Sequence, residues 1–128
     1  MIIRSSAVMK TARADVWVTI LAGGKVDFYS GTMPAAGGTP PGGLLASVTF
    51  PTPPGTVTAG AFSVTPNLET VATLSGDPTW CRVYKANGDW LLDLDCGETN
   101  STAAVWVSPL SIFSGGTLRL IKLKLIEP

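Results

Sequence analysis

The feature that most constrains the fold is the segment WCRVYKANGDWLLDLDC, residues 80–96. Asn87-Gly88 at its centre is a strong hairpin signal, because a two-residue type I′ turn needs positive φ at both central positions. Closing this turn with Ala86 and Asp89 sets the pairing of the flanking strands. The expected partners are Lys85 with Trp90, Tyr84 with Leu91, Val83 with Leu92, Arg82 with Asp93, and Cys81 with Leu94. A chain built around such a ribbon is expected to be a β domain.

Side-chain alternation divides this hairpin into two faces. The dry face comprises Cys81, Val83, Leu92, Leu94 and Cys96, and the polar face comprises Trp80, Arg82, Tyr84, Leu91, Asp93 and Asp95. This division is typical of an antiparallel sheet that is packed on one side only. On the polar face we expect Arg82 to pair with Asp93 across the strands and Asp95 to be solvated.

Composition excludes several classes of function. The chain has 128 residues, 45% of them hydrophobic and 14% charged, with a formal net charge of zero, so a nucleic-acid partner is not expected. No apolar run approaches the ~20 residues that a membrane span needs. The N-terminus has no signal-peptide pattern, and we expect synthesis in a cytoplasm. Fourteen Gly and ten Pro favour short strands joined by tight connections.

Most of the chain reads as one domain, residues 11–128, preceded by an N-terminal arm, residues 1–10, which has no clear periodicity. Residues 11–22 fit either a helix ending at Gly23-Gly24 or a β-branched strand, and the helix is favoured. Residues 31–43, GTMPAAGGTPPGG, form a long surface loop. The other expected strands are residues 25–30, 44–50, two or three short segments between 55 and 74, 103–107 and 117–126.

The last of these strands changes phase. Leu118 and Leu120 lie on one face, whereas Leu123 and Leu125 continue the apolar series on the opposite parity. Because one face of a strand stays buried, this change predicts a β-bulge or a crossing between sheets near Leu120-Ile121. With about eight strands in total, we expect an all-β, two-sheet antiparallel β-sandwich of jelly-roll or Ig-like type, with at most one short N-terminal helix.

The residues offer little catalytic chemistry. The chain has no histidine, so neither the serines nor the two cysteines have the usual partner of a nucleophile. Cys81 and Cys96 are expected to be buried free thiols, and no metal or cofactor is expected. Three alternatives remain open: an acid/base or divalent-ion site at Asp93, Asp95 and Glu98, a phosphate loop at the Gly-rich segment, and a sugar-stacking platform. The aromatic residues of that platform would be Trp80, Tyr84, Trp90 and Trp106.

Taken together, several segments resemble a group of small tailed-phage proteins. These are VDFYSGTMP, GLLASVTF, the hairpin TWCRVYKANGDWLLDLDCG and the closing SGGTLRLIKLKLIEP, so the resemblance covers roughly residues 10–128. It implies a non-enzymatic virion structural protein, either a capsid decoration or cement protein or a tail or neck component. The two cysteines and the apolar, lysine-bearing last strand depart from that pattern. A carbohydrate-binding β-sandwich that uses Trp80 and Tyr84 is the alternative from another functional class.

If the resemblance holds, the partners are phage structural proteins, above all the major capsid protein, and the protein is present in many copies or as a homo-oligomer on the virion. It would then be made in the host cytoplasm and located in the virion. The candidate interface residues are Arg4, Lys10, Pro34, Pro40, Pro41, Trp80, Arg82, Tyr84, Lys122 and Lys124. Opposite charges, acidic from Asp77 to Glu98 and basic along the last strand, are expected to pair within the domain or between copies.

Overall fold

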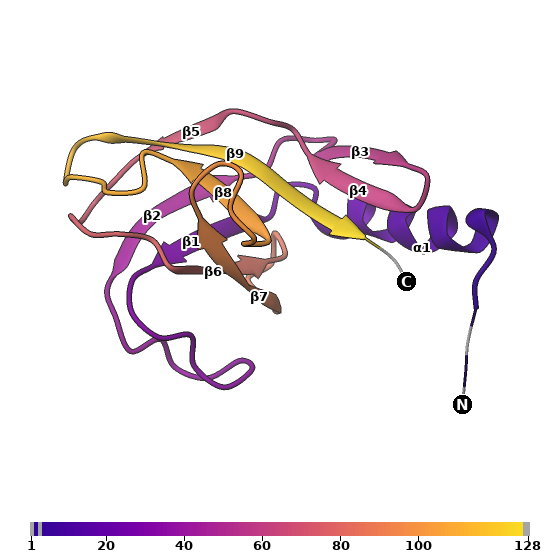
Figure 1. Cartoon of the computed structure of the whole chain (residues 1–128), viewed down its shortest axis with the longest axis horizontal. Helices are drawn as coiled ribbons and strands as arrows, with labels where there is room; N and C mark the ends of the chain where they lie inside the picture. Colours follow the sequence, from indigo (N-terminus) through magenta and orange to yellow (C-terminus); the bar gives the residue numbers. More distant parts are fainter. Residues whose placement is uncertain (1, 3, 127–128) are drawn as a thin grey trace.

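The computed structural model describes residue 2 and residues 4–126 and is mostly β with one helix (Figure 1). In chain order the elements are α1 (Ala7–Ile20), β1 (Lys25–Tyr29), β2 (Leu44–Thr49), β3 (Gly55–Thr58), β4 (Ala61–Val64), β5 (Leu68–Val71), β6 (Trp80–Tyr84), β7 (Trp90–Gly97), β8 (Val105–Ser108) and β9 (Thr117–Ile126). The expected strands at residues 25–30, 44–50 and 117–126 are confirmed. The expected strand at residues 103–107 begins two residues later, at Val105.

The strands form one continuous, curled sheet in the order β2-β1-β6-β7-β8-β9-β4-β3, with β5 paired to β9 outside this path. All the pairs are antiparallel except β7 with β8, which is parallel. The all-β class is therefore confirmed, but the predicted two-sheet antiparallel sandwich is not. The sheet curls far enough for the segment after β5 to reach β2, where the Thr73 amide donates to the Leu45 carbonyl at 2.8 Å.

The hairpin between β6 and β7 contains two irregularities that cancel. Its loop has three residues rather than two, because the Lys85 amide donates to Asp89 and the Gly88 amide to Lys85, both at 2.9 Å. Only Gly88 has positive φ, as in a type I turn followed by a left-handed glycine. The longer loop pairs Tyr84 with Trp90, and a bulge then restores the expected pairing of Val83 with Leu92.

Leu91 is the extra residue of that bulge. The predicted partners Arg82–Asp93 and Cys81–Leu94 are therefore confirmed, whereas the predicted type I′ turn and the pairs Tyr84–Leu91 and Lys85–Trp90 are wrong. A turn signal locates a hairpin but does not distinguish a two-residue loop from a three-residue loop, because both accept glycine at the same position.

The phase change in the last strand is a bulge, as predicted. β8 pairs with β9 through Trp106–Lys122 and then Val107–Leu120, which leaves Ile121 as the extra residue. On its other edge β9 pairs first with β5, at residues 117–120, and then with β4, at residues 124–126. The bulge thus lets a single strand contribute Leu118, Leu120 and Leu123 to one core.

The helix expected within residues 11–22 is confirmed, and it begins earlier, at Ala7. Ser6 is its N-cap, since the Ser6 hydroxyl accepts a hydrogen bond from the Met9 amide at 3.1 Å. Residues 7–10 of the predicted arm are therefore helical. The helix ends at Ile20, and Gly23 follows in the left-handed region at φ 72°. It packs against β3 and β4 at one end of the molecule (Figure 1).

The hydrophobic core lies inside the curl of the sheet and draws on nearly every strand. Its largest fully buried side chains include Phe28, Phe62, Leu118, Leu120 and Leu123, with Leu21 from the end of α1. The central strands β1 and β6 are buried on both faces. In each strand every residue but one, Lys25 in β1 and Tyr84 in β6, has little exposed surface. The expectation of a sheet packed on one side only is wrong for these strands.

Candidate functional site

The predicted ion pair lies on the outer face of the sheet and is buried there. Arg82 Nε donates to Asp93 Oδ1 at 2.7 Å and Arg82 Nη2 donates to Asp93 Oδ2 at 3.1 Å, which is a two-pronged contact. The two side chains are only 6% and 5% exposed. Burial alone would raise the pKa of Asp93, but hydrogen bonds from Arg82 and Trp90 outweigh it and the pKa is lowered. The hydrogen bond to Asp93 raises the pKa of Arg82.

A second carboxylate extends this pair into a row across three strands. Asp27 of β1 is opposite Arg82 in the register and is 4% exposed. The Ser47 hydroxyl of β2 donates to Asp27 Oδ1 at 2.5 Å, and Lys25 Nζ lies 3.4 Å from Asp27 Oδ2. Buried charges persist when each is paired and hydrogen-bonded, and this row meets that condition.

Aromatic rings border the charged row. Tyr29 and Trp80 stack with centroids 4.7 Å apart and an interplanar angle of 18°. The Arg82 guanidinium lies 5.3 Å from the centroid of the Trp80 ring. Burial, with the nearby charge of Asp27, raises the pKa of Tyr29 to about 12. The rings therefore close the row against water and do not form an open platform.

The cover over this face is the loop between β1 and β2, residues 31–43. A Cβ on Gly37 would lie 3.4 Å from the Trp90 ring, and the Gly37 amide donates to the Asp93 carboxylate. At the start of the loop, the Thr79 hydroxyl donates to the Gly31 carbonyl at 2.6 Å. Contacts within the chain therefore hold this surface loop against the sheet.

Burial corrects two of the predicted interface residues. Trp80 is 1% exposed and Arg82 is 5% exposed, so neither is available to a partner, and Tyr84 is half-buried. The same burial removes Trp80 from any sugar-stacking surface. Trp90 is 42% exposed, but its indole N–H is bound to Asp93 Oδ1 at 3.1 Å.

The remaining predicted interface residues lie in three separate places. Arg4 is exposed, and Lys10 is half-buried against Gly60. Pro41 is exposed and Pro34 and Pro40 are half-buried in the covering loop. On β9, Lys124 is exposed, whereas Lys122 Nζ lies 3.9 Å from the centroid of the Trp106 ring. The structure does not bring these residues into one surface.

The acidic and cysteine residues that the sequence offered as candidate site residues are held by contacts within the fold. Asp95 is exposed, as expected, and its Oδ1 accepts the Ala104 amide at 2.9 Å. Cys81 is a buried free thiol, and burial, with the adjacent Cys96 thiol, raises its pKa. Cys96 is free but half-buried. Among the described residues, no group of three or more His, Cys, Asp or Glu side chains is placed to hold a metal. The one helix in the described part of the chain, α1, is too short to cross a membrane.

The sequence reasoning missed an apolar surface at the end of the molecule opposite α1. We call it the loop-end patch and define it as Leu44, Val71, Leu74 and Phe113, with exposures of 36%, 61%, 48% and 73%. Backbone hydrogen bonds hold its two main segments together, from Ala72 to Gly116 and from Gly115 back to Ala72, both at 2.8 Å. Single apolar residues at strand ends and in loops carry no pattern, so only the fold shows that the segments that bear them lie together.

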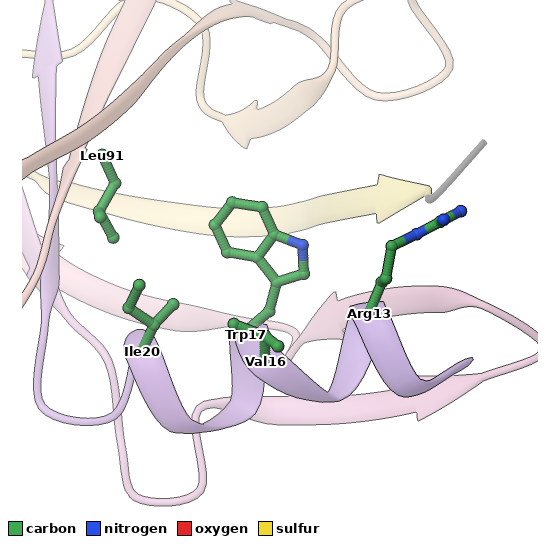
Figure 2. Close-up of a pocket in the computed structure, with 5 residues that line it drawn as sticks. All are labelled: Arg13, Val16, Trp17, Ile20 and Leu91. Carbon is green, nitrogen blue, oxygen red and sulfur yellow. The ribbon is translucent and has the colours of Figure 1, made fainter. Parts of the chain in front are cut away.

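A pocket of about 260 Å³ opens between α1 and β7. Val16, Trp17 and Ile20 of the helix and Leu91 of the hairpin bulge line it, and Arg13 stands at its rim (Figure 2). The lining is almost wholly apolar, as in many ligand and peptide sites. The stripe Val16, Trp17, Ile20 was visible in the sequence, but Leu91 was expected on a polar face.

The described residues therefore hold three notable features: a sealed row of charges, an exposed apolar patch and an apolar pocket beside a strand. The first is structural, and the other two are surfaces at which another molecule can bind. Comparison of the chain with protein-family models, with curated proteins and with solved structures finds no match.

Proposed function

We propose that this protein is a non-enzymatic structural protein of a tailed-phage virion, a decoration or cement protein that binds and stabilises the capsid lattice. The resemblance of its strand and hairpin segments to small phage proteins motivates the proposal. A component of the tail or neck is the alternative within the same class. In both cases the partner is another virion protein, and the major capsid protein is the first candidate.

The loop-end patch is the observation that carries the proposal. Scattered apolar side chains are normal on protein surfaces, but a contiguous group marks a surface for another protein or a ligand. Here Val71 at the end of β5, Leu74 shortly after it and Phe113 lie on two segments that are hydrogen-bonded to each other. A preformed, uncharged surface of this kind fits a lattice of repeated protein better than a soluble substrate.

The charge balance supports the same partner. The chain has nine basic and nine acidic residues. On its surface Arg119 and Glu69 form an ion pair, with Arg119 Nη2 2.7 Å from Glu69 Oε1. Such a surface has no strong field to attract nucleic acid. Burial of apolar area is then the main source of affinity, with Trp- or Phe-type anchors contributing most.

The experiment is binding of the purified protein to preformed capsid shells. The wild-type protein should bind in fixed stoichiometry and raise the temperature at which the shells disrupt, because a ligand of the assembled state stabilises that state by mass action. Phe113→Glu should weaken binding at least tenfold, since it places a charge in the centre of the patch. The matched control is Thr56→Glu, at an exposed position of β3.

Both variants should melt at the wild-type temperature, because both positions are exposed. If Phe113→Glu saturates the shells as well as the control does, the patch is not the binding surface and the proposal loses its support. If the wild-type protein does not bind shells and is recovered only with isolated tails, the tail or neck alternative replaces the capsid decoration proposal.

A further inference from the structure

We propose that this protein associates with itself by arm exchange: the N-terminal segment of a second copy adds along the free edge of β7 and places Ile2 in the pocket between α1 and β7. This contact does not use the loop-end patch. Self-association is measured on the purified protein without shells, so this proposal is tested independently of the proposed function.

The free edge of β7 follows from its register. Residues from Trp90 to Asp95 pair with β6, but on the other side only Cys96 and Gly97 pair with β8. The Cys96 amide donates to the Thr79 carbonyl at 3.0 Å, so by alternation the backbone groups of Asp93 and Asp95 point away from β6. Within the described part of the chain no strand covers that edge. An uncovered edge is a template for another extended chain.

The pocket lies directly beside this edge. Leu91, the extra residue of the β7 bulge, forms one wall, and Trp17 and Ile20 of α1 form the opposite side (Figure 2). A strand added to β7 therefore runs past an apolar hole of about 260 Å³. Strand addition combines backbone hydrogen bonds with pockets for alternate side chains, and this edge offers both.

The N-terminal segment has the chemistry that this surface requires. Ile2 is 84% exposed and Arg4 is exposed, and both lie before the helix cap. Ser5, the next residue, accepts a hydrogen bond from Arg13 Nη2 at 3.0 Å. Arg13 also lies at the rim of the pocket, so the N-terminal segment of each copy begins next to the pocket of that same copy. From there an extended chain advances about 3.3–3.6 Å per residue.

Charge selects the same segment. Asp89 immediately precedes β7 and is exposed, and the structure gives no ion pair to it within the described residues. In an extended segment Ile2 and Arg4 share one side, two residues apart. When Ile2 occupies the pocket beside Leu91, an added strand that runs antiparallel to β7 places Arg4 two residues along the edge, beside Asp89.

Reciprocal exchange completes the contact. Each copy has one N-terminal segment and one pocket, so two copies satisfy both through two identical contacts, as in a closed two-fold dimer. The dimer is therefore the smallest assembly that leaves no segment and no pocket unused.

The test is the oligomeric state of the full chain, measured by sedimentation over a range of concentrations. We expect a monomer–dimer equilibrium that Ile2→Asp and Arg4→Glu each weaken at least tenfold. Lys124→Glu is the matched control for charge and Leu110→Asp for an exposed apolar residue, and neither should change the equilibrium. Because all four positions are exposed, melting temperatures should be unchanged and folding defects cannot explain the result.

Charge exchange then tests the partner surface. Asp89→Lys, combined with Arg4→Glu, should restore dimerisation, because the two charges are then exchanged across the same contact. A wild-type protein that stays monomeric throughout would overturn the proposal. Dimers that are indifferent to both Ile2→Asp and Arg4→Glu, or that Asp89→Lys does not rescue in the Arg4→Glu background, would overturn it equally.

Discussion

The two faces of β6 are equally buried, yet different forces hold them. Cys81 and Val83 point into the aliphatic core, and Trp80 and Arg82 point to the outer face, and all four are at most 5% exposed. The inner face rests on apolar burial, which is non-directional and worth about 25 cal/mol per Å². The outer face rests on paired charges, which stabilise only while every partner is present. Equal burial therefore does not mean equal tolerance of change.

The comparison also shows what alternation reports. A strand that alternates apolar and polar residues has two chemically distinct faces, but it does not follow that the polar face meets water. Here the loop of residues 31–43 covers the polar face, and Gly37 contacts both Trp90 and Asp93. A covered polar face needs an internal partner for each charge: Arg82 and Asp93 supply one another, and Asp27 has Ser47 and Lys25.

The largest expected effect comes from breaking the outer face at one charge. Asp93→Ala should lower the free energy of unfolding by about 3–5 kcal/mol, because it leaves the buried Arg82 without its two-pronged partner. The measurement is a denaturant melt. The double variant Arg82→Met with Asp93→Leu removes both charges and should recover most of that loss. If the double variant is as unstable as the single one, the ion pair itself stabilises this face, and the loss in Asp93→Ala does not come from the unpaired Arg82 alone.

A smaller effect is expected from the dry side of the hairpin. Leu92→Ala should cost about 2 kcal/mol, the low end for such truncations, because Leu92 is only half-buried. Leu91→Ala should cost less, since Leu91 borders an existing pocket and its removal only enlarges that space. Paired denaturant melts measure the difference. Equal costs would contradict the placement of Leu91 as the extra residue of the bulge.

The covering loop can be loosened at a single position. Gly37→Ala should cost about 1–2 kcal/mol, the usual penalty of a left-handed backbone for a residue with a side chain, reduced by the contact that its methyl group makes with the Trp90 ring at 3.4 Å. Gly31→Ala is the control, because Gly31 has similar positive φ but open space around its Cβ position. Thermal melts compare the two. If the control is equally destabilised, the contact between the loop and Trp90 contributes nothing.

The smallest effect is a dependence on pH. The folded-state pKa of Asp93 is lowered, so its contribution to stability is complete above the unfolded value of about 3.9 and is lost as the pH falls through the folded pKa. The wild-type protein should therefore lose stability below about pH 4 more steeply than Asp93→Asn does. Melts between pH 2 and 7 measure this. Parallel profiles for the two proteins would mean that Asp93 is not the group that titrates.

Much of the fold could be predicted because its signals are local. Period-two alternation located β1, β2 and β9, and the parity change in β9 correctly indicated the bulge at Ile121. Cross-strand counting from Asn87-Gly88 gave the partners of Cys81, Arg82 and Val83. That count succeeded because one extra loop residue and one bulge residue cancel, and it failed for Tyr84, between the two irregularities.

The sequence by itself determined which residues form strands, where the hairpin lies and that Arg82 meets Asp93, because backbone sterics and alternation act over a few residues. The tertiary structure alone decided that the sheet is one curled layer with β7 parallel to β8, that a Gly/Pro loop covers the charged row, and that Leu91 faces α1 across a pocket. It also decided that Val71, Leu74 and Phe113 form a patch. These outcomes depend on contacts between segments far apart in the chain, and nothing in the local pattern of either segment specifies its partner.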